Sequence, residues 1–230
     1  MASRPRRLFA EFLGTLLLAA VVVGSGIAAQ TLSPGQVGLE LAENAIATAL
    51  GLGVIILVLA PISGAHLNPV ISLIDSLLGR RSWIDAITYI PVQILGCIAG
   101  TLLANLMFGR GIVTISTADR SSPGHFISEI VATAGLVLVV FLLARQRLEH
   151  LAPIAVGAYI GAAYFFTSST SFANPAITIG RIFTDSFAGI APNCVLAFIG
   201  AQLIGGAIGY ALVRILTTKP RTPTTGGQRT

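Results

Sequence analysis

The sequence predicts an all-α integral membrane protein with six transmembrane helices and two shorter, re-entrant half-helices. Hydrophobic residues make up 54% of the 230 residues, charged residues make up 10%, and the mean hydropathy is +0.85. A soluble domain carries about 25% charged residues, so this composition is typical of a membrane-embedded chain. Two Asn-Pro pairs, Asn68-Pro69 and Asn174-Pro175, lie about half a chain apart, and each opens a short apolar segment.

Six apolar stretches are long enough to cross a hydrocarbon core about 30 Å thick. They cover residues 8–29, 41–62, 84–108, 125–144, 151–168 and 193–216. The first stretch follows a basic cluster and has no convincing cleavage site, so it is interpreted as a helix and not as a signal peptide. Residues 1–217 are therefore predicted to form a single transmembrane domain. Residues 218–230, rich in Thr, Gly and Pro, are predicted to be a disordered cytoplasmic tail.

Each Asn-Pro pair predicts the start of a short helix. Asn is favoured at the N-cap and Pro at the first helical position. Each Asn opens a mostly apolar segment of about ten residues, 68–78 and 174–183, which gives about 15 Å of helix, or half of the hydrocarbon core. Two such half-helices in matching places of a chain are typical of a permeation or binding site near the bilayer midplane.

The chain repeats itself, which predicts two homologous halves of about 1–110 and 123–216. Matching residues occur in the same order in each half: Glu11, Thr15, Gln93, Gly96 and Gly100 in the first, and Glu129, Thr133, Gln202, Gly205 and Gly209 in the second. Each half holds three spans, an odd number, so the second half is expected to be inserted upside down. The glycines spaced by four residues predict close contacts between helices.

The distribution of basic residues predicts the orientation. With the N-terminus inside, only Arg110, Arg120 and Arg181 of the 14 Lys and Arg residues fall on the outer side. This bias indicates cytoplasmic N- and C-termini. The net charge of +5 is therefore attributed to membrane anchoring, and no nucleic-acid partner is expected. The first half-helix then enters from the cytoplasm and the second from outside, so their N-termini meet in the middle.

Asn68 and Asn174 are predicted to lie at the midplane of a pore. Each Asn can cap its own helix through its side-chain oxygen, which leaves the amide NH2 to donate into a lumen. Each helix N-terminus carries about half a positive charge, so two ends that face one lumen disfavour cations and hydronium. The pattern predicts a pore for neutral solutes, with no cofactor, no metal and no catalytic residue.

Two segments resemble the signature loops of the major intrinsic protein family, the aquaporins and glycerol facilitators: Ser63-Gly64-Ala65-His66-Leu67-Asn68-Pro69 and Ser171-Phe172-Ala173-Asn174-Pro175-Ala176. The resemblance covers nearly the whole chain and implies an aquaporin-like fold and a homotetramer with one pore per subunit. It also implies that backbone carbonyls of the loops before each Asn line the pore, together with Ala65, His66 and Phe172. The alternative for His66 is a loop residue satisfied by its neighbours.

The same resemblance implies that Glu11 and Glu129 accept hydrogen bonds from the two loops and hold their shape. Ionisable groups inside a span are costly, and their symmetric placement argues for a shared role. The alternative is a proton relay in a secondary transporter, because inverted repeats with broken helices also build transporters. A coupling site would need carboxylates beside the helix breaks, whereas Asp75 and Asp185 lie at the far ends of the half-helices.

The expected selectivity constriction departs from the family pattern. Water-selective members carry Arg directly after the second Asn-Pro-Ala, where this chain has Ile177. Counting back from the two asparagines places the other constriction positions of the family at Thr48, Ala162 and Ser171. A ring of four uncharged residues, with no aromatic among them, predicts a constriction that is wider and less polar than a water filter.

Arg181 lies one helical turn after the missing arginine and has two interpretations. The favoured one places it at the rim of the outer vestibule, in an i,i+4 pair with Asp185. The other lets its guanidinium reach back toward the constriction, because helical side chains lean toward their own N-terminus.

The predicted function is passive conduction of small uncharged solutes, with ions and protons excluded. Candidate solutes are water, glycerol, urea and metalloid hydroxides such as arsenite. The expected partners are the solute and membrane lipid, and the expected location is a bacterial plasma (inner) membrane. The alternatives are the secondary transporter and a structural membrane protein with a vestigial pore.

Overall fold

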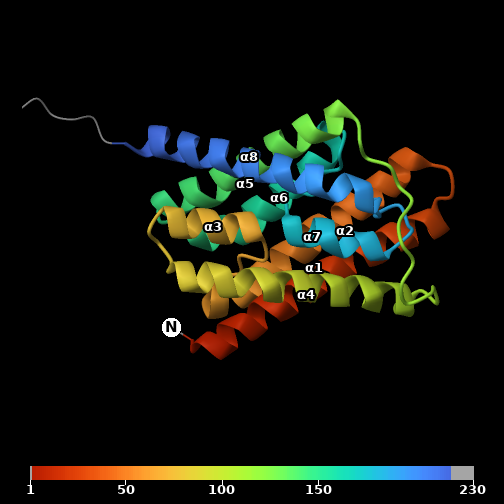
Figure 1. Cartoon of the computed structure of the whole chain (residues 1–230), viewed down its shortest axis with the longest axis horizontal. Coiled ribbons are helices and arrows are strands. Elements are labelled where there is room, and N and C mark those ends of the chain that lie inside the picture. Colours follow the sequence, from red (N-terminus) through yellow and green to blue (C-terminus); the bar gives the residue numbers. More distant parts are fainter. Residues whose placement is uncertain (1, 219–230) are drawn as a thin grey trace, which may run out of the picture.

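The protein is a bundle of helices, and no strand occurs in the part that the structure describes, residues 2–218 of a computed structural model (Figure 1). Five helices are long and apolar enough to cross a membrane: α1 (Arg4–Leu32), α2 (Val37–Ser63), α4 (Trp83–Met107), α5 (Pro123–Arg145) and α8 (Pro192–Thr217). The shorter elements are α3 (Pro69–Leu77), η1 (Glu149–Leu151), α6 (Ala152–Phe166), α7 (Pro175–Gly180) and η2 (Arg181–Phe183). The predicted all-α membrane fold is confirmed, while the predicted tail beyond Thr218 lies outside the described residues.

The fifth predicted span, 151–168, is shorter than the sequence indicated. Helix α6 has 15 residues, and the turn of η1 precedes it. It ends because Thr167 takes an extended conformation, and the Thr167 hydroxyl donates to the Ala163 carbonyl at 2.6 Å. The chain therefore leaves the helix early and turns toward the second Asn-Pro pair.

Glycines bring the long helices together in the same way in both halves. Helix α1 packs along α4, and α5 packs along α8. A Cβ atom at Gly96 of α4 would collide with the Thr15 hydroxyl of α1, and one at Gly205 of α8 would collide with the Ile130 carbonyl of α5. Small residues at these crossings let the backbones approach closely, as is typical of membrane helices.

The two half-helices lie end to end in the middle of the bundle, between α4 and α8 (Figure 1). Each begins at an Asn-Pro pair as predicted. The Asn68 side-chain oxygen accepts from the Val70 amide at 2.9 Å, and that of Asn174 accepts from the Ala176 amide at 3.0 Å. Asn in an extended conformation followed by Pro is the local sequence that starts a helix abruptly.

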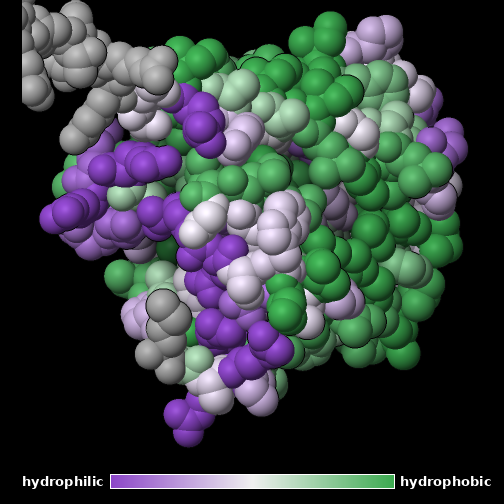
Figure 2. Space-filling view, turned by 60° about the vertical axis from the view of Figure 1, so that its left-hand side comes forward, coloured by the Kyte–Doolittle hydropathy of each residue, from purple (hydrophilic) through white to green (hydrophobic). Residues whose placement is uncertain are grey.

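The surface of the molecule is divided between a hydrophilic end and apolar flanks. Figure 2 shows hydrophilic residues gathered at the end where the N-terminus lies, next to a largely hydrophobic flank. Large apolar side chains of α2 are exposed on such a flank, among them Leu50, Val54 and Leu57. An apolar surface of this extent suits contact with lipid, as expected of a multi-pass membrane protein.

Candidate functional site

A cavity of about 340 Å³ runs along the bundle, with one apolar wall built from helix faces. Lining residues recur at every fourth position of α2 and α6, which places them on one face of each helix. They are Thr48, Leu52, Ile56 and Ala60 of α2, and Ala152, Val156, Ile160 and Tyr164 of α6. The first and last residues of each set are twelve positions apart, or about 18 Å along the helix, so the cavity follows the bundle axis for that length.

The facing wall is formed by the two loops that precede the asparagines. Ala65, Ser171 and Phe172 line it together with Asn68 and Asn174. Both loops contain residues in the left-handed region of φ, which side chains other than glycine rarely adopt. These include Ala65 (φ 46°) and Leu67 (52°) in the first loop and Ser171 (50°) and Ala173 (47°) in the second. Such conformations persist only where surrounding contacts hold them.

Glu11 holds the first loop. Its carboxylate is fully buried (0% exposed) and accepts four hydrogen bonds. The donors are Ser63 Oγ at 2.7 Å, the His66 amide at 3.0 Å, the Leu67 amide at 2.7 Å and Gln93 Nε2 at 2.8 Å. A buried charge is tolerated when donors surround it in this way, and charge-assisted bonds are the stronger kind.

Glu129 holds the second loop with the same set of partners. It is also fully buried. Its donors are Ser169 Oγ at 2.7 Å, the Phe172 amide at 2.9 Å, the Ala173 amide at 2.8 Å and Gln202 Nε2 at 2.7 Å. The two carboxylates therefore fix the two loops in equivalent shapes. Each accepts its hydrogen bonds from a serine hydroxyl, two backbone amides and a glutamine side chain.

The asparagines link the two halves to each other. Asn68 Nδ2 donates to the Ala173 carbonyl at 2.8 Å, and Asn174 Nδ2 donates to the Leu67 carbonyl at 2.8 Å. From the sequence, both N–H groups of each amide were expected to be free for a lumen. The structure corrects this, because one N–H of each amide crosses to the opposite loop. The other N–H is the one that remains for a solute in the cavity.

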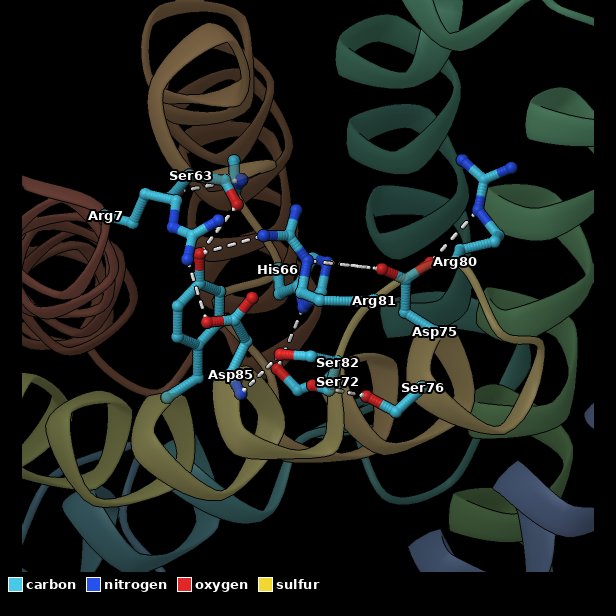
Figure 3. Close-up of polar contacts among 12 residues, drawn as sticks. Arg7, Ser63, His66, Ser72, Asp75, Ser76, Arg80, Arg81, Ser82 and Asp85 are labelled. Carbon is cyan, nitrogen blue, oxygen red and sulfur yellow. Dashed lines mark hydrogen bonds and ion pairs between the residues drawn. The ribbon is translucent and has the colours of Figure 1, made fainter. Parts of the chain in front are cut away.

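The end of the cavity near the N-terminus is lined by a cluster of charges around Asp75 (Figure 3). The carboxylate is 3.3 Å from His66 Nε2, 3.1 Å from Arg80 Nε and 3.4 Å from Arg81 Nε. The other ring nitrogen of His66 lies 3.0 Å from the Ser72 hydroxyl. His66 lines the cavity as predicted, and Asp75 also lines it, which the sequence did not indicate.

Comparison with known proteins agrees with this geometry. The profile of the Major intrinsic protein family matches residues 2–173. The aquaglyceroporin AqpS of Rhizobium meliloti is 45% identical over 216 residues, which cover 94% of this chain and 92% of that protein. The chain belongs to the major intrinsic protein family.

Two further similarities extend the comparison within this family. The glycerol uptake facilitator protein of Streptococcus pneumoniae is 32% identical over 227 residues, covering 89% of this chain and 95% of that protein. The crystal structure of the aquaglyceroporin from Plasmodium falciparum superposes with a TM-score of 0.69 at 22% identity, covering 92% of this chain and 94% of the other. The second similarity establishes the shared fold.

At the other end of the cavity, this major intrinsic protein has a lining that corrects the expected constriction. Thr48, Ser171 and Ile177 line the cavity, but Ala162 does not and is exposed. Its place is taken by Tyr164, whose hydroxyl lies 3.2 Å from that of Thr48. The count back from Asn174 without gaps gave Ala162, two residues before Tyr164. Two residues correspond to about 200° of helix rotation, which places the two side chains on opposite faces.

The favoured interpretation of Arg181 is also wrong. Its side chain is 2% exposed, lines the cavity and makes no ion pair with Asp185 within residues 2–218. Arg181 Nε donates to the Ala188 carbonyl, and its Cζ lies 3.4 Å from the centroid of the Phe172 ring. Asp185 is exposed and accepts from the Thr117 amide at 2.9 Å.

The end of the cavity away from the Asp75 cluster therefore contains an aromatic residue, Tyr164, and a cation, Arg181, which sequence counting did not place there. The signal for Tyr164 was available, because it lies four residues after Ile160 on the same helix face. The signal for Arg181 was ambiguous, because the turn of η2 that follows α7 decides where the side chain points.

Proposed function

We propose that this chain conducts water, glycerol and similar small neutral polyols passively along the cavity. It is a membrane channel and not an enzyme, as its family and the names of its relatives indicate: one is an aquaglyceroporin and another a glycerol uptake facilitator. The observation that carries the choice of solute is the division of the cavity into an apolar wall of helix faces and a polar wall of loops.

A polyol matches such a cavity because its hydroxyl groups and its carbon–hydrogen groups can face opposite walls. Leu52, Ile56, Val156 and Ile160 offer apolar surface to the carbon backbone. The loops offer polar groups to the hydroxyls. An ion would lose its hydration shell in the same cavity without gaining an opposite charge at the midplane, which is a large penalty.

The outer constriction is proposed to consist of Thr48, Tyr164, Ser171, Ile177 and Arg181. Arg181 supplies donors to a solute hydroxyl, because within residues 2–218 its only side-chain hydrogen bond uses Nε. The Ser171 hydroxyl is buried and has no protein partner within the same residues, so it is free to bind a solute. Ile177 keeps the position after Asn-Pro-Ala apolar and leaves room for a carbon backbone.

The midplane is proposed to exclude protons. Asn68 and Asn174 hold each other's loops and have one N–H each for a passing oxygen. The N-termini of α3 and α7 add positive potential at the same place, which disfavours hydronium. Glu11 and Glu129 do not form a relay in this proposal, since loop and amide donors occupy them.

Urea and metalloid hydroxides such as undissociated arsenous acid are proposed as further solutes. Both are small, neutral and rich in hydrogen-bonding groups. We also propose that the protein is a homotetramer in a bacterial plasma (inner) membrane with both termini in the cytoplasm. The basic residues near the N-terminus support this orientation through the positive-inside rule.

Stopped-flow light scattering on proteoliposomes tests the proposal. Vesicles are exposed to an osmotic gradient to measure water flux, and to gradients of glycerol, urea and arsenite to measure solute flux. Empty vesicles serve as the control. Water and glycerol flux above the control, unaffected by imposed pH or sodium gradients, is expected. Flux at the level of empty vesicles would support the vestigial pore, and accumulation driven by an ion gradient would support the transporter.

A further inference from the structure

Two arginines from distant parts of the chain share one aromatic ring at the outer end of the cavity. Arg181 Cζ lies 3.4 Å from the centroid of Phe172, and Arg120 Cζ lies 5.1 Å from it. Arg181 and Phe172 line the cavity, whereas Arg120 does not. Arg120 comes from the connection between α4 and α5, so it reaches the site from outside the repeated core (Figure 1).

The same two arginines also share one backbone segment, residues 187–189, which presents three successive carbonyl groups to them. Arg120 Nε donates to the Gly189 carbonyl at 2.9 Å, and Arg120 Nη2 donates to the Phe187 carbonyl at 3.1 Å. Arg181 Nε donates to the carbonyl between them, that of Ala188. The position of one guanidinium is thereby tied to the position of the other.

Arg120 also ties this segment to the loop that carries the second asparagine. Arg120 Nη1 donates to the Ser169 carbonyl at 3.3 Å, and the Ser169 hydroxyl donates a hydrogen bond to the Glu129 carboxylate. Within residues 2–218, neither Arg120 nor Arg181 forms an ion pair with a carboxylate. Carbonyl oxygens and the ring face of Phe172 therefore stabilise both charges, and cation–π contacts contribute more where water is excluded.

We infer that Arg120 is a positioning residue for solute selection: it fixes Phe172 and residues 187–189, and through them the guanidinium of Arg181 at the outer constriction. A guanidinium suits this role because its planar fork donates in several directions at once, which an ammonium group cannot reproduce. The inference rests on the proposed function, since it requires Arg181 to limit the size of the passing solute. Without Arg120, Arg181 gains freedom and larger polyols pass more easily.

A double-mutant cycle tests the inference. Arg120→Met, Arg181→Met and the double variant are reconstituted at matched protein density, and the permeability ratio of a five-carbon polyol to water is measured by stopped-flow light scattering. Arg110→Met is the matched control, because Arg110 belongs to the same connection but makes its bond to the Asp185 carbonyl. Arg120→Lys is the conservative variant, and it replaces Arg120→Met in the cycle if that variant does not fold.

Arg181→Met is expected to raise the ratio most, and Arg120→Met to raise it about threefold, which corresponds to the loss of about one net hydrogen bond. The permeability ratio of Arg120→Lys should be close to that of Arg120→Met. The ratio of Arg110→Met should equal that of the wild type. In the Arg181→Met background, Arg120→Met should have no further effect, because it acts through Arg181.

Two results would overturn the inference in distinguishable ways. In the first, Arg181→Met changes the permeability ratio, but Arg120→Met either leaves it unchanged or changes it equally with and without Arg181. Arg120 then does not act through Arg181, and the proposed constriction stands. If Arg181→Met leaves the ratio unchanged in a protein that still conducts water, the proposed constriction and the inference fail together.

Discussion

The two loops that meet at the centre of the channel are held alike, whereas the two ends of the cavity are built differently. Glu11 and Glu129 accept equivalent bonds from a serine, two successive amides and a glutamine. Beyond α3, the arginines Arg80 and Arg81 surround a carboxylate, Asp75. Beyond α7, Arg181 contacts a ring and a carbonyl group.

In the proposed function, this difference separates the contacts that hold the loops from the residues that select the solute. The repeated contacts keep strained loops in place and are needed equally in both halves. At the proposed inner end, Arg80, Arg81 and His66 all face the Asp75 carboxylate. At the proposed outer end, Arg181 lines the cavity and its one side-chain hydrogen bond within residues 2–218 uses Nε, so we propose that solutes are distinguished at that end.

The largest expected effect follows from breaking the repeated contacts. Glu129→Gln places an amide donor against backbone donors, and Glu11→Gln does the same in the other half. Each should lower the free energy of unfolding by at least about 3 kcal/mol, because bonds to a charged group contribute about 1.5–3 kcal/mol each. Thermal unfolding in detergent, followed through the fluorescence of Trp83, measures this. Unequal losses in the two variants would mean that the halves are not structurally equivalent.

A second effect concerns the outer end. Ile177→Arg adds a guanidinium to the cavity lining that includes Tyr164 and Arg181, and within residues 2–218 Arg181 has no carboxylate partner. Glycerol permeability should fall several-fold and water permeability less, as measured on proteoliposomes with matched incorporation. The variant Ile177→Leu, similar in volume and uncharged, is the control. Unchanged glycerol permeability in Ile177→Arg would show that residue 177 is not part of the constriction.

The fold was predictable from the sequence because its signals are local. Asn-Pro pairs set the helix starts, and apolar stretches set the spans. The loop contacts of the repeated glutamates came from the family resemblance, because Glu11 lies 55 and 56 residues before the two amides that it binds. The constriction was less predictable, because it depends on where helices end. Tyr164 and not Ala162 lines the cavity, because a count without gaps cannot give the length of the loop before Asn174, and Arg181 is buried instead of paired with the exposed Asp185.

A smaller effect is expected from Tyr164→Phe. This variant keeps the ring at the constriction and removes the hydroxyl that lies 3.2 Å from the Thr48 hydroxyl. A neutral hydrogen bond contributes about 1 kcal/mol net, so the glycerol-to-water permeability ratio should change by no more than a few-fold. Tyr164→Ala should change it more, since it also opens the constriction. An equal change in both variants would assign the effect to the hydroxyl alone.

The smallest effect is expected at the inner end. Arg80 Nη2 lies 3.6 Å from the Glu149 carboxylate, and both side chains are substantially exposed. Exposed ion pairs contribute at most about 1 kcal/mol, so Glu149→Gln should leave both stability and flux within error of the wild type. A clear loss of flux in this variant would show that the pair across the inner mouth regulates conduction.

The most direct test of the difference between the ends compares Arg181→Met with Asp75→Asn in one stopped-flow experiment. The measured quantity is the permeability ratio of a five-carbon polyol to water, in proteoliposomes of matched density. Arg181→Met should raise this ratio several-fold, while Asp75→Asn should leave it unchanged even if total flux falls. A ratio that responds to Asp75→Asn and not to Arg181→Met would place solute selection at the inner end and contradict this account.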